Sequence, residues 1–121
     1  MLKAKGEIVF TLEDKNYVAD QLRPAFMFAE GLLFTGGIKS DNDMYYHGQK
    51  YNVDVEFYTV EKEAYSILKP LLGDFMDLPV CSGKRILGKA TLRDFIYIDM
   101  PYTYTEDVLA VSETDAEYGS F

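Results

Sequence analysis

Short segments in which apolar and polar residues alternate are the feature that most limits how this chain can fold. Residues 2–12, LKAKGEIVFTL, place five apolar side chains on one face: Leu2, Ala4, Ile8, Phe10 and Leu12. Residues 51–60, YNVDVEFYTV, repeat the pattern with Val53, Val55 and Phe57. A period of two is that of a strand with one buried and one solvated face. Both segments are therefore predicted to be β-strands.

Turn signals separate further apolar segments along the chain. The segments AFMFA (25–29), GLLFTGGI (31–38) and DFMDLPVC (74–81) are predicted to be extended, the second interrupted by Gly36 and Gly37. Residues 82–98 supply the last strands, and the composition of SDNDMYYHGQ (40–49) predicts a polar loop. About six short strands, with a turn signal roughly every ten residues, favour a β-sandwich or a β-barrel.

One segment, EKEAYSILKPLLG (61–73), has the period of a helix. Its expected buried stripe consists of Ala64, Ile67, Leu68, Leu71 and Leu72. Glu61 and Glu63 suit the first turn of a helix, and Pro70 limits the regular part to about two turns. The predicted fold class is therefore all-β with one short helix.

Length and charge divide the chain into two parts. A chain of 121 residues, 48% of them hydrophobic, has the size of one domain, which is predicted over 1–98. Residues 99–121 are predicted to be a partly ordered acidic extension, with apolar side chains at Tyr102, Tyr104, Val108, Leu109 and Val111. This extension has no base and six acids: Asp99, Glu106, Asp107, Glu113, Asp115 and Glu117.

The charge balance bears on the kind of partner. The net charge is −8, and residues 1–98 hold 12 bases and 14 acids, so most of the excess lies in the extension. Nucleic-acid binding relies on bases that neutralise phosphates, so this balance argues against a general nucleic-acid binder. A basic protein is the more natural partner.

Location is constrained by what the sequence lacks. No apolar run approaches the ~20 residues of a membrane helix, and the first residues do not resemble a secretory signal. A single Cys81 cannot form an internal disulfide. We expect a cytoplasmic protein that does not bind membranes.

Five motifs in a fixed order make the chain similar to one known family. They are AKGEIVF (4–10), RPAFMF (23–28), Thr35-Gly36, HGQKYNVDVEF (47–57) and SGKRILGKATLRDF (82–95). Together they resemble the C-terminal β-barrel domain, the third domain, of translation elongation factor Tu. The resemblance covers roughly residues 2–98. It implies a small closed or partly open antiparallel β-barrel and favours a translation-related protein.

The resemblance also suggests structural roles for the last motif. Gly83 fits the turn that opens it, and Gly88 fits a kink or bulge where a side chain would collide with a neighbouring strand. Arg85 occupies the position of the family's arginine. It is expected to brace the turn through backbone carbonyls or a carboxylate rather than to bind a ligand.

Departures from the family limit what the resemblance implies. No phosphate-binding loop of the form GxxxxGK[ST] occurs, so GTP binding is not implied. The family contacts aminoacyl-tRNA through a glutamine after Arg-Pro and a glutamate before Gly-Gly-Arg. These positions are Ala25 and Ser82 here. Binding of tRNA is therefore not expected.

Residues that carry chemistry are sparse. His47 and Cys81 are each the only residue of their type, and they are expected to be a turn residue and a buried thiol. Asp41 and Asp43 begin like a calcium loop, but Tyr46 stands where that loop needs glycine. We expect no cofactor, no metal and no enzymatic activity, although carboxylate pairs such as Asp74 and Asp77 leave an unrecognised enzyme site as an alternative.

Tyrosines mark the most distinctive part of the chain. The candidate protein interface comprises Tyr45, Tyr46, Tyr51 and Tyr58, together with Glu106 and Asp107 of the extension. The favoured function is a non-catalytic barrel that binds another protein. Two alternatives are an immunity protein that neutralises a basic toxin and an RNA- or translation-associated factor.

Overall fold

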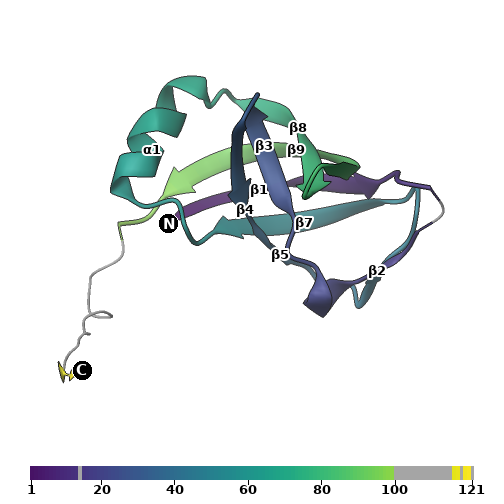
Figure 1. Cartoon of the computed structure of the whole chain (residues 1–121), viewed down its shortest axis with the longest axis horizontal. Coiled ribbons are helices and arrows are strands. Elements are labelled where there is room, and N and C mark those ends of the chain that lie inside the picture. The colour runs from purple at the N-terminus through teal and green to yellow at the C-terminus, as the bar shows by residue number, and fades with distance from the viewer. Residues whose placement is uncertain (14, 100–115, 118, 121) are drawn as a thin grey trace.

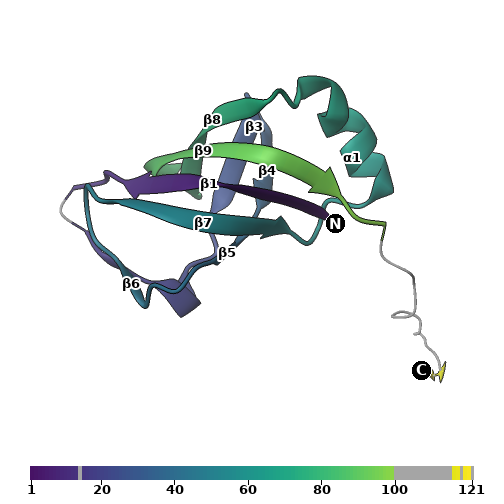
Figure 2. The ribbon, with the colours of Figure 1, turned by 180° about the vertical axis from the view of Figure 1, so that it is seen from behind.

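The computed structural model describes residues 1–13, 15–99, 116–117 and 119–120. Seven strands form one curled, half-barrel sheet in the order β4-β3-β8-β9-β1-β7-β5, in which all neighbours are antiparallel. Figures 1 and 2 show this sheet from two sides. The predicted class, an antiparallel barrel-like sheet with one short helix, is confirmed.

The elements follow the predicted segments closely. In the main sheet they are β1 (Leu2–Phe10), β3 (Ala25–Ala29), β4 (Leu32–Thr35), β5 (Gly37–Lys39), β7 (Lys50–Phe57), β8 (Phe75–Ser82) and β9 (Arg85–Tyr97). The others are β2 (Tyr17–Val18), the 3₁₀ turn η1 (Ala19–Gln21), β6 (Met44–Tyr45), α1 (Lys62–Leu68), the 3₁₀ turn η2 (Lys69–Leu71), β10 (Ala116–Glu117) and β11 (Gly119–Ser120). Strands β2 and β6 pair with each other, as do β10 and β11.

The central strand β1 positions both halves of the sheet. Its alternation is confirmed, because Leu2, Ala4, Ile8 and Phe10 are buried whereas Lys5 and Glu7 are exposed. It pairs with β7 on one side and with β9 on the other. The inward residues of these strands, joined by Phe26 of β3, build a core of aliphatic side chains and edge-to-face phenyl rings.

One kinked segment supplies both edges of the sheet. Strands β4 and β5 are the two outermost strands, yet only Gly36 separates them in the chain. The amide of Gly36 donates to the carbonyl of Pro24 at 3.0 Å, so the segment stays attached to the β3 side as it turns. A Cβ on Gly36 would lie 2.7 Å from the ring of Phe26, which explains the glycine. The chain thus crosses from one edge of the half-barrel to the other.

Two expectations about burial are wrong. The segment 40–49 is not wholly a polar loop, because it contains β6 and the fully buried Tyr45. The helical stripe is also misplaced. Leu68 is buried, but Ile67 and Leu71 are 62% and 43% exposed.

The helix α1 lies at the end of the sheet that holds the N-terminus (Figure 1). Tyr65 stacks on Tyr97 of β9, with ring centroids 4.3 Å apart and an interplanar angle of 10°. This stack turns Tyr65, rather than Ile67, toward the sheet. The extension's predicted features, from Tyr102 to Val111 and including Glu106 and Asp107, lie outside the described residues.

Candidate protein-interaction surface

The outer face of the sheet carries a hollow that we call the outer-face hollow. It has a volume of about 350 Å³ and is lined by Lys3, Ala4, Lys5, Lys39, Asp54, Glu56, Asp94, Ile96 and Ile98. These residues come from β1, β5, β7 and β9 and from the chain that leaves β9. Segments far apart in the sequence therefore meet at this site.

Strand register explains why these side chains meet. Lys3 is paired with Glu56 on one side and with Ile96 on the other. Two residues further along β1, Lys5 is paired with Asp54, which is itself paired with Lys39 of β5. Side chains directly opposite one another across antiparallel strands have Cβ atoms about 5 Å apart. The result is a set of lysines and carboxylates in alternation.

A bulge in β9 brings the isoleucines to this face. Between the pairs Lys3–Ile96 and Lys5–Arg93 the partner strand contains one extra residue. Asp94, within the bulge, has a φ of 55°, a left-handed conformation that aspartate tolerates better than most residues. After the bulge, Ile96 and Ile98 point outward and are 58% and 38% exposed.

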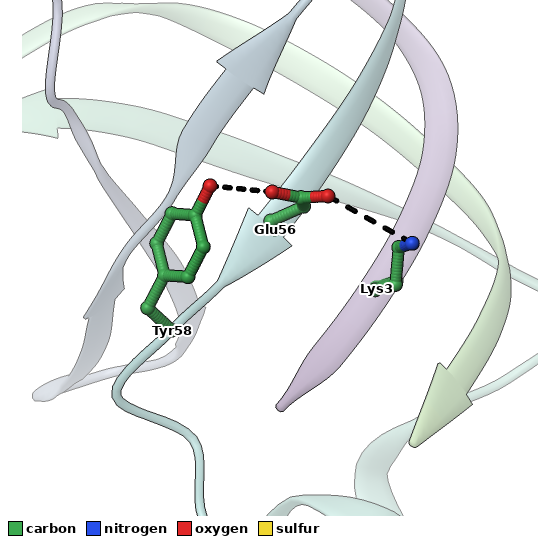
Figure 3. Close-up of polar contacts among 3 residues, drawn as sticks. All are labelled: Lys3, Glu56 and Tyr58. Carbon is green, nitrogen blue, oxygen red and sulfur yellow. Dashed lines mark hydrogen bonds and ion pairs between the residues drawn. The ribbon is translucent and has the colours of Figure 1, made fainter. Parts of the chain in front are cut away.

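Glu56 is the best-connected polar residue of the hollow (Figure 3). It accepts a hydrogen bond from the Tyr58 hydroxyl, and its other carboxylate oxygen lies 3.8 Å from Nζ of Lys3. The Tyr58 ring packs over Gly37 of β5, where a Cβ would lie 2.9 Å from the ring. These contacts give Glu56 and Tyr58 fixed positions beside the hollow although Tyr58 is 53% exposed.

The charges of the outer-face hollow are balanced. Its three lysines face three carboxylates, those of Asp54, Glu56 and Asp94. A balanced rim does not attract a polyanion such as nucleic acid, whose binding depends on an excess of bases. It does suit a protein surface that presents both signs of charge. The exposed isoleucines supply the apolar part of such a contact.

The predicted tyrosine interface is split by the structure. Tyr46 and Tyr58 are exposed, whereas Tyr51 is half-buried and its hydroxyl accepts a hydrogen bond from the Tyr46 amide at 2.8 Å. Tyr45 cannot serve as a surface residue, because it is fully buried against Phe10 and its hydroxyl is bonded to Ser40 Oγ at 2.6 Å. Among these four, Tyr58 alone adjoins the outer-face hollow.

The last sequence motif forms the tight β8–β9 hairpin. Gly83, with a φ of 60°, lies in the turn between the paired residues Ser82 and Arg85. The guanidinium of Arg85 lies 3.9 Å from the carboxylate of Glu13. The arginine thus pairs with the loop after β1 rather than with the carbonyls of its own turn. Because both partners are exposed, this ion pair contributes little to stability.

Gly88 lies beside the register shift in β8–β9 and against β1. Val80 is paired with Gly88, but the next residue, Cys81, is paired with Ile86, so Leu87 is the extra residue of a bulge. A Cβ on Gly88 would lie only 2.0 Å from the carbonyl oxygen of Val9. The two strands therefore approach each other in a way that only glycine permits.

The residues considered for catalysis lie in β8 and in different loops. Cys81 is buried in β8, whereas His47 is exposed and its amide donates to Asn16 Oδ1 at 3.0 Å. Asp77 accepts a hydrogen bond from Thr91 Oγ1 at 2.6 Å across the β8–β9 pair. Within the described part of the chain, no three His, Cys, Asp or Glu side chains come together to hold a metal ion.

Comparison with known proteins does not assign the chain to a family. No protein-family model matches the chain, and no curated protein matches it in sequence. None of the described helices is long and apolar enough to cross a membrane.

Sequence reasoning missed most of the hollow. Alternation in segments 2–12 and 51–60 predicts Lys3, Lys5, Asp54 and Glu56 only as residues on the solvated faces of strands, and Ile96 only as part of a strand. Their meeting depends on register between strands, which a single sequence does not specify. The sequence contains one signal for the hollow, the Gly36-Gly37 pair. Gly37 leaves space for the ring of Tyr58, which lies beside the hollow.

Proposed function

We propose that this chain is a non-catalytic protein-interaction module that binds a partner protein through the outer-face hollow. The observation that carries the proposal is the exposure of Ile96 and Ile98 beside each other in a charge-lined hollow. Apolar side chains exposed together and rimmed by charges are typical of interaction sites. The isoleucines would supply affinity, and the lysines and carboxylates would fix the orientation of the partner.

A matched pair of variants tests the proposal. Proteins retained from a lysate of the host cell by the immobilised full-length chain are identified and purified, and their affinities for the chain are measured by calorimetry. We expect Ile96→Asp to weaken binding at least tenfold, because it places a charge in the apolar part of the contact. The control is Ile67→Asp, at an isoleucine of similar exposure on α1.

The outcome of this comparison is decisive in both directions. A partner lost with Ile96→Asp and kept with Ile67→Asp supports the proposal, whereas capture of a protein by the wild type alone does not. Equal affinities of wild type and Ile96→Asp would place the interface elsewhere and contradict the proposal.

A second candidate function is the neutralisation of a basic protein such as a nuclease toxin. It is supported by residues 99–121, which contain six acids and no base. A toxin gene next to the gene for this chain, together with inhibition of that toxin by the purified chain, would establish it. If deletion of residues 100–121 left inhibition unchanged, the extension would have no part in it.

Descent from the third domain of elongation factor Tu is also a proposal. Its support is the order of the five sequence motifs, which fall on β1, β3, the end of β4, β7 and β8–β9 of an antiparallel half-barrel. The loss of the family's RNA-contacting side chains at Ala25 and Ser82 favours a protein partner over tRNA in such a descendant.

A further inference from the structure

A second surface of different character lies at the far end of the sheet. Residues from three parts of the chain meet there, and we call them the basic pole: 9–13 with 15–16, 47–50, and 83–89. Val9 is paired with Lys89 on one side and with Lys50 on the other. The amide of Gly48 donates to the carbonyl of Phe10 at 2.8 Å, and that of Thr11 to the carbonyl of Leu87 at 2.9 Å. Figures 1 and 2 show this end opposite the N-terminus.

The net charge of the basic pole is positive, whereas that of the rest of the chain is negative. The pole contains five of the twelve bases, Lys15, Lys50, Lys84, Arg85 and Lys89. Its described residues include one acid, Glu13. Even with Asp14 counted from the sequence, the rest of the chain has seven bases and eighteen acids. All five basic side chains belong to exposed residues. A positive surface thus lies on a chain whose net charge is −8.

Few of these charges are paired. Among the described residues, the only ion pair at the pole is the exposed contact of Arg85 with Glu13 at 3.9 Å. Lys50 and Lys89 lie on strands either side of β1, so their Cα atoms are about 10 Å apart, at twice the spacing of adjacent strands. Only Val9, half-buried, separates them. Two like charges so placed favour an anionic ligand between them.

The acidic extension is attached at the end of the sheet opposite to the pole. Residue 99 follows the end of β9 that pairs with Leu2, whereas the pole lies beyond Val9. The nine residues of β1 separate the two ends by about 26 Å. Exposed charges are largely screened beyond about 8–10 Å at physiological salt. At that distance the charge of Asp99 has little effect on the pole.

An apolar side chain accompanies the bases. Ile86 lies between Arg85 and Leu87 in β9 and is 56% exposed. An aliphatic anchor beside several bases matches a peptide that presents carboxylates around an apolar residue. A nucleic-acid strand fits less well, because it has phosphates but no aliphatic side chain to place against Ile86.

We propose that the basic pole binds a short acidic segment of a partner protein, with Lys50 and Lys89 holding carboxylates and Ile86 receiving an apolar side chain. This site is separate from the outer-face hollow, so the two proposals succeed or fail independently. Because the attraction is electrostatic, binding weakens as salt concentration rises.

Binding of a defined probe tests this proposal. The probe is a fluorescein-labelled peptide of about twelve residues, with glutamates around two central leucines, and its binding to the full-length chain is followed by anisotropy. We expect the double variant Lys50→Glu/Lys89→Glu to bind the peptide about tenfold more weakly at low salt, because two attractions become repulsions. The control is Lys62→Glu/Lys69→Glu, which changes the net charge equally at α1 and η2, at the other end of the molecule.

Each result decides the question. Weakened binding in the pole variant alone, with circular dichroism unchanged, supports the proposal. It is overturned if the wild type does not bind the peptide even at low salt, or if the pole variant binds as the wild type does. It is likewise overturned if both double variants lose affinity equally, or if a single-stranded RNA of equal length binds more tightly than the peptide at the same salt.

Discussion

Two tyrosines of the core show how much one hydroxyl can matter. Tyr17 and Tyr45 are paired across β2 and β6, and both rings contact Phe10. The Tyr45 hydroxyl is bonded to Ser40, whereas the buried Tyr17 hydroxyl has no hydrogen-bond partner among the described residues. A buried polar group without a partner is destabilising, but the same group with a partner is not.

The same chemical change should therefore have opposite effects at these two positions. We expect Tyr17→Phe to raise the free energy of unfolding by about 1 kcal/mol, because it removes an unsatisfied hydroxyl. Tyr45→Phe should lower it by about 1 kcal/mol, because Ser40 loses its partner. Urea unfolding of the two variants measures both values. Changes of the same sign would contradict the assigned surroundings of one hydroxyl.

Replacement of Gly88, the glycine of β9, should lower the stability of the protein. An added methyl group would overlap the carbonyl of Val9, so the two central strands would have to separate. We expect Gly88→Ala to lower the free energy of unfolding by about 3 kcal/mol. Gly73→Ala is the control, because its nearest neighbour would lie at an ordinary 3.7 Å, and it should change stability by less than about 0.5 kcal/mol. If Gly88→Ala and Gly73→Ala had similar unfolding midpoints in urea, β1 and β9 would tolerate a wider spacing.

At the scale of elements, the contact between α1 and β9 has a titratable component. The pKa of Tyr97 is raised above its usual 10.0, first by burial of the phenol and next by the charge of Asp99. The folded chain therefore keeps this proton to higher pH than the unfolded chain does. The stability that Tyr97 contributes is present below about pH 10 and is lost as the pH rises through the folded-state pKa.

Removal of the neighbouring charge should reveal this effect. We expect Asp99→Asn to lower the pKa of Tyr97 toward 10.0, because the nearby negative charge no longer opposes ionisation. An NMR titration of ring-labelled tyrosine measures the change, with Asp20→Asn in η1 as a distant control. If Tyr97 titrated identically in the wild type and in Asp99→Asn, the carboxylate would have no influence on the phenol.

The strands could be predicted because alternation is a local signal. The helix could also be predicted, but the face that it buries could not. Alternation in residues 2–12 and 51–60 marked β1 and β7 and their buried faces. The period of residues 61–73 marked α1, but the helix packs through Leu68 with Ala64 and Tyr65, and Ile67 faces solvent. The rotation comes from the stack of Tyr65 on Tyr97, a contact between residues 32 positions apart, about which the helical period contains no information.

The candidate surfaces were less predictable than the fold for the same reason. Lys3 and Glu56 meet through register between strands, and Lys50 and Lys89 are neighbours only because both flank Val9. Tyr45 is predicted to be a surface residue because segment 40–49 is rich in Asp, Asn and Ser, although its ring packs on Phe10. Composition describes a segment, whereas burial depends on what the rest of the chain places against it.

At the scale of the whole molecule, the described core lies within the predicted domain, residues 1–98. Every core residue that the structure describes, including those partly buried against the core, lies between Leu2 and Tyr97. We expect a chain ending at Asp99 to fold and to keep its thermal midpoint within about 4 °C of the full chain, since none of the described core contacts is removed. Thermal unfolding followed by circular dichroism tests this. A fall of more than about 10 °C would mean that residues 100–121 take part in the core.

The kink at Gly36 has a consequence for behaviour at high concentration. Exposed sheet edges are templates on which one chain can add to another and start a fibre. Here the outermost strands, β4 and β5, offer only four and three residues, and they diverge at Gly36. These two described strands therefore offer a second chain no long, straight edge to extend. A protein with ten tyrosines and eight phenylalanines thereby gains a geometric defence against aggregation.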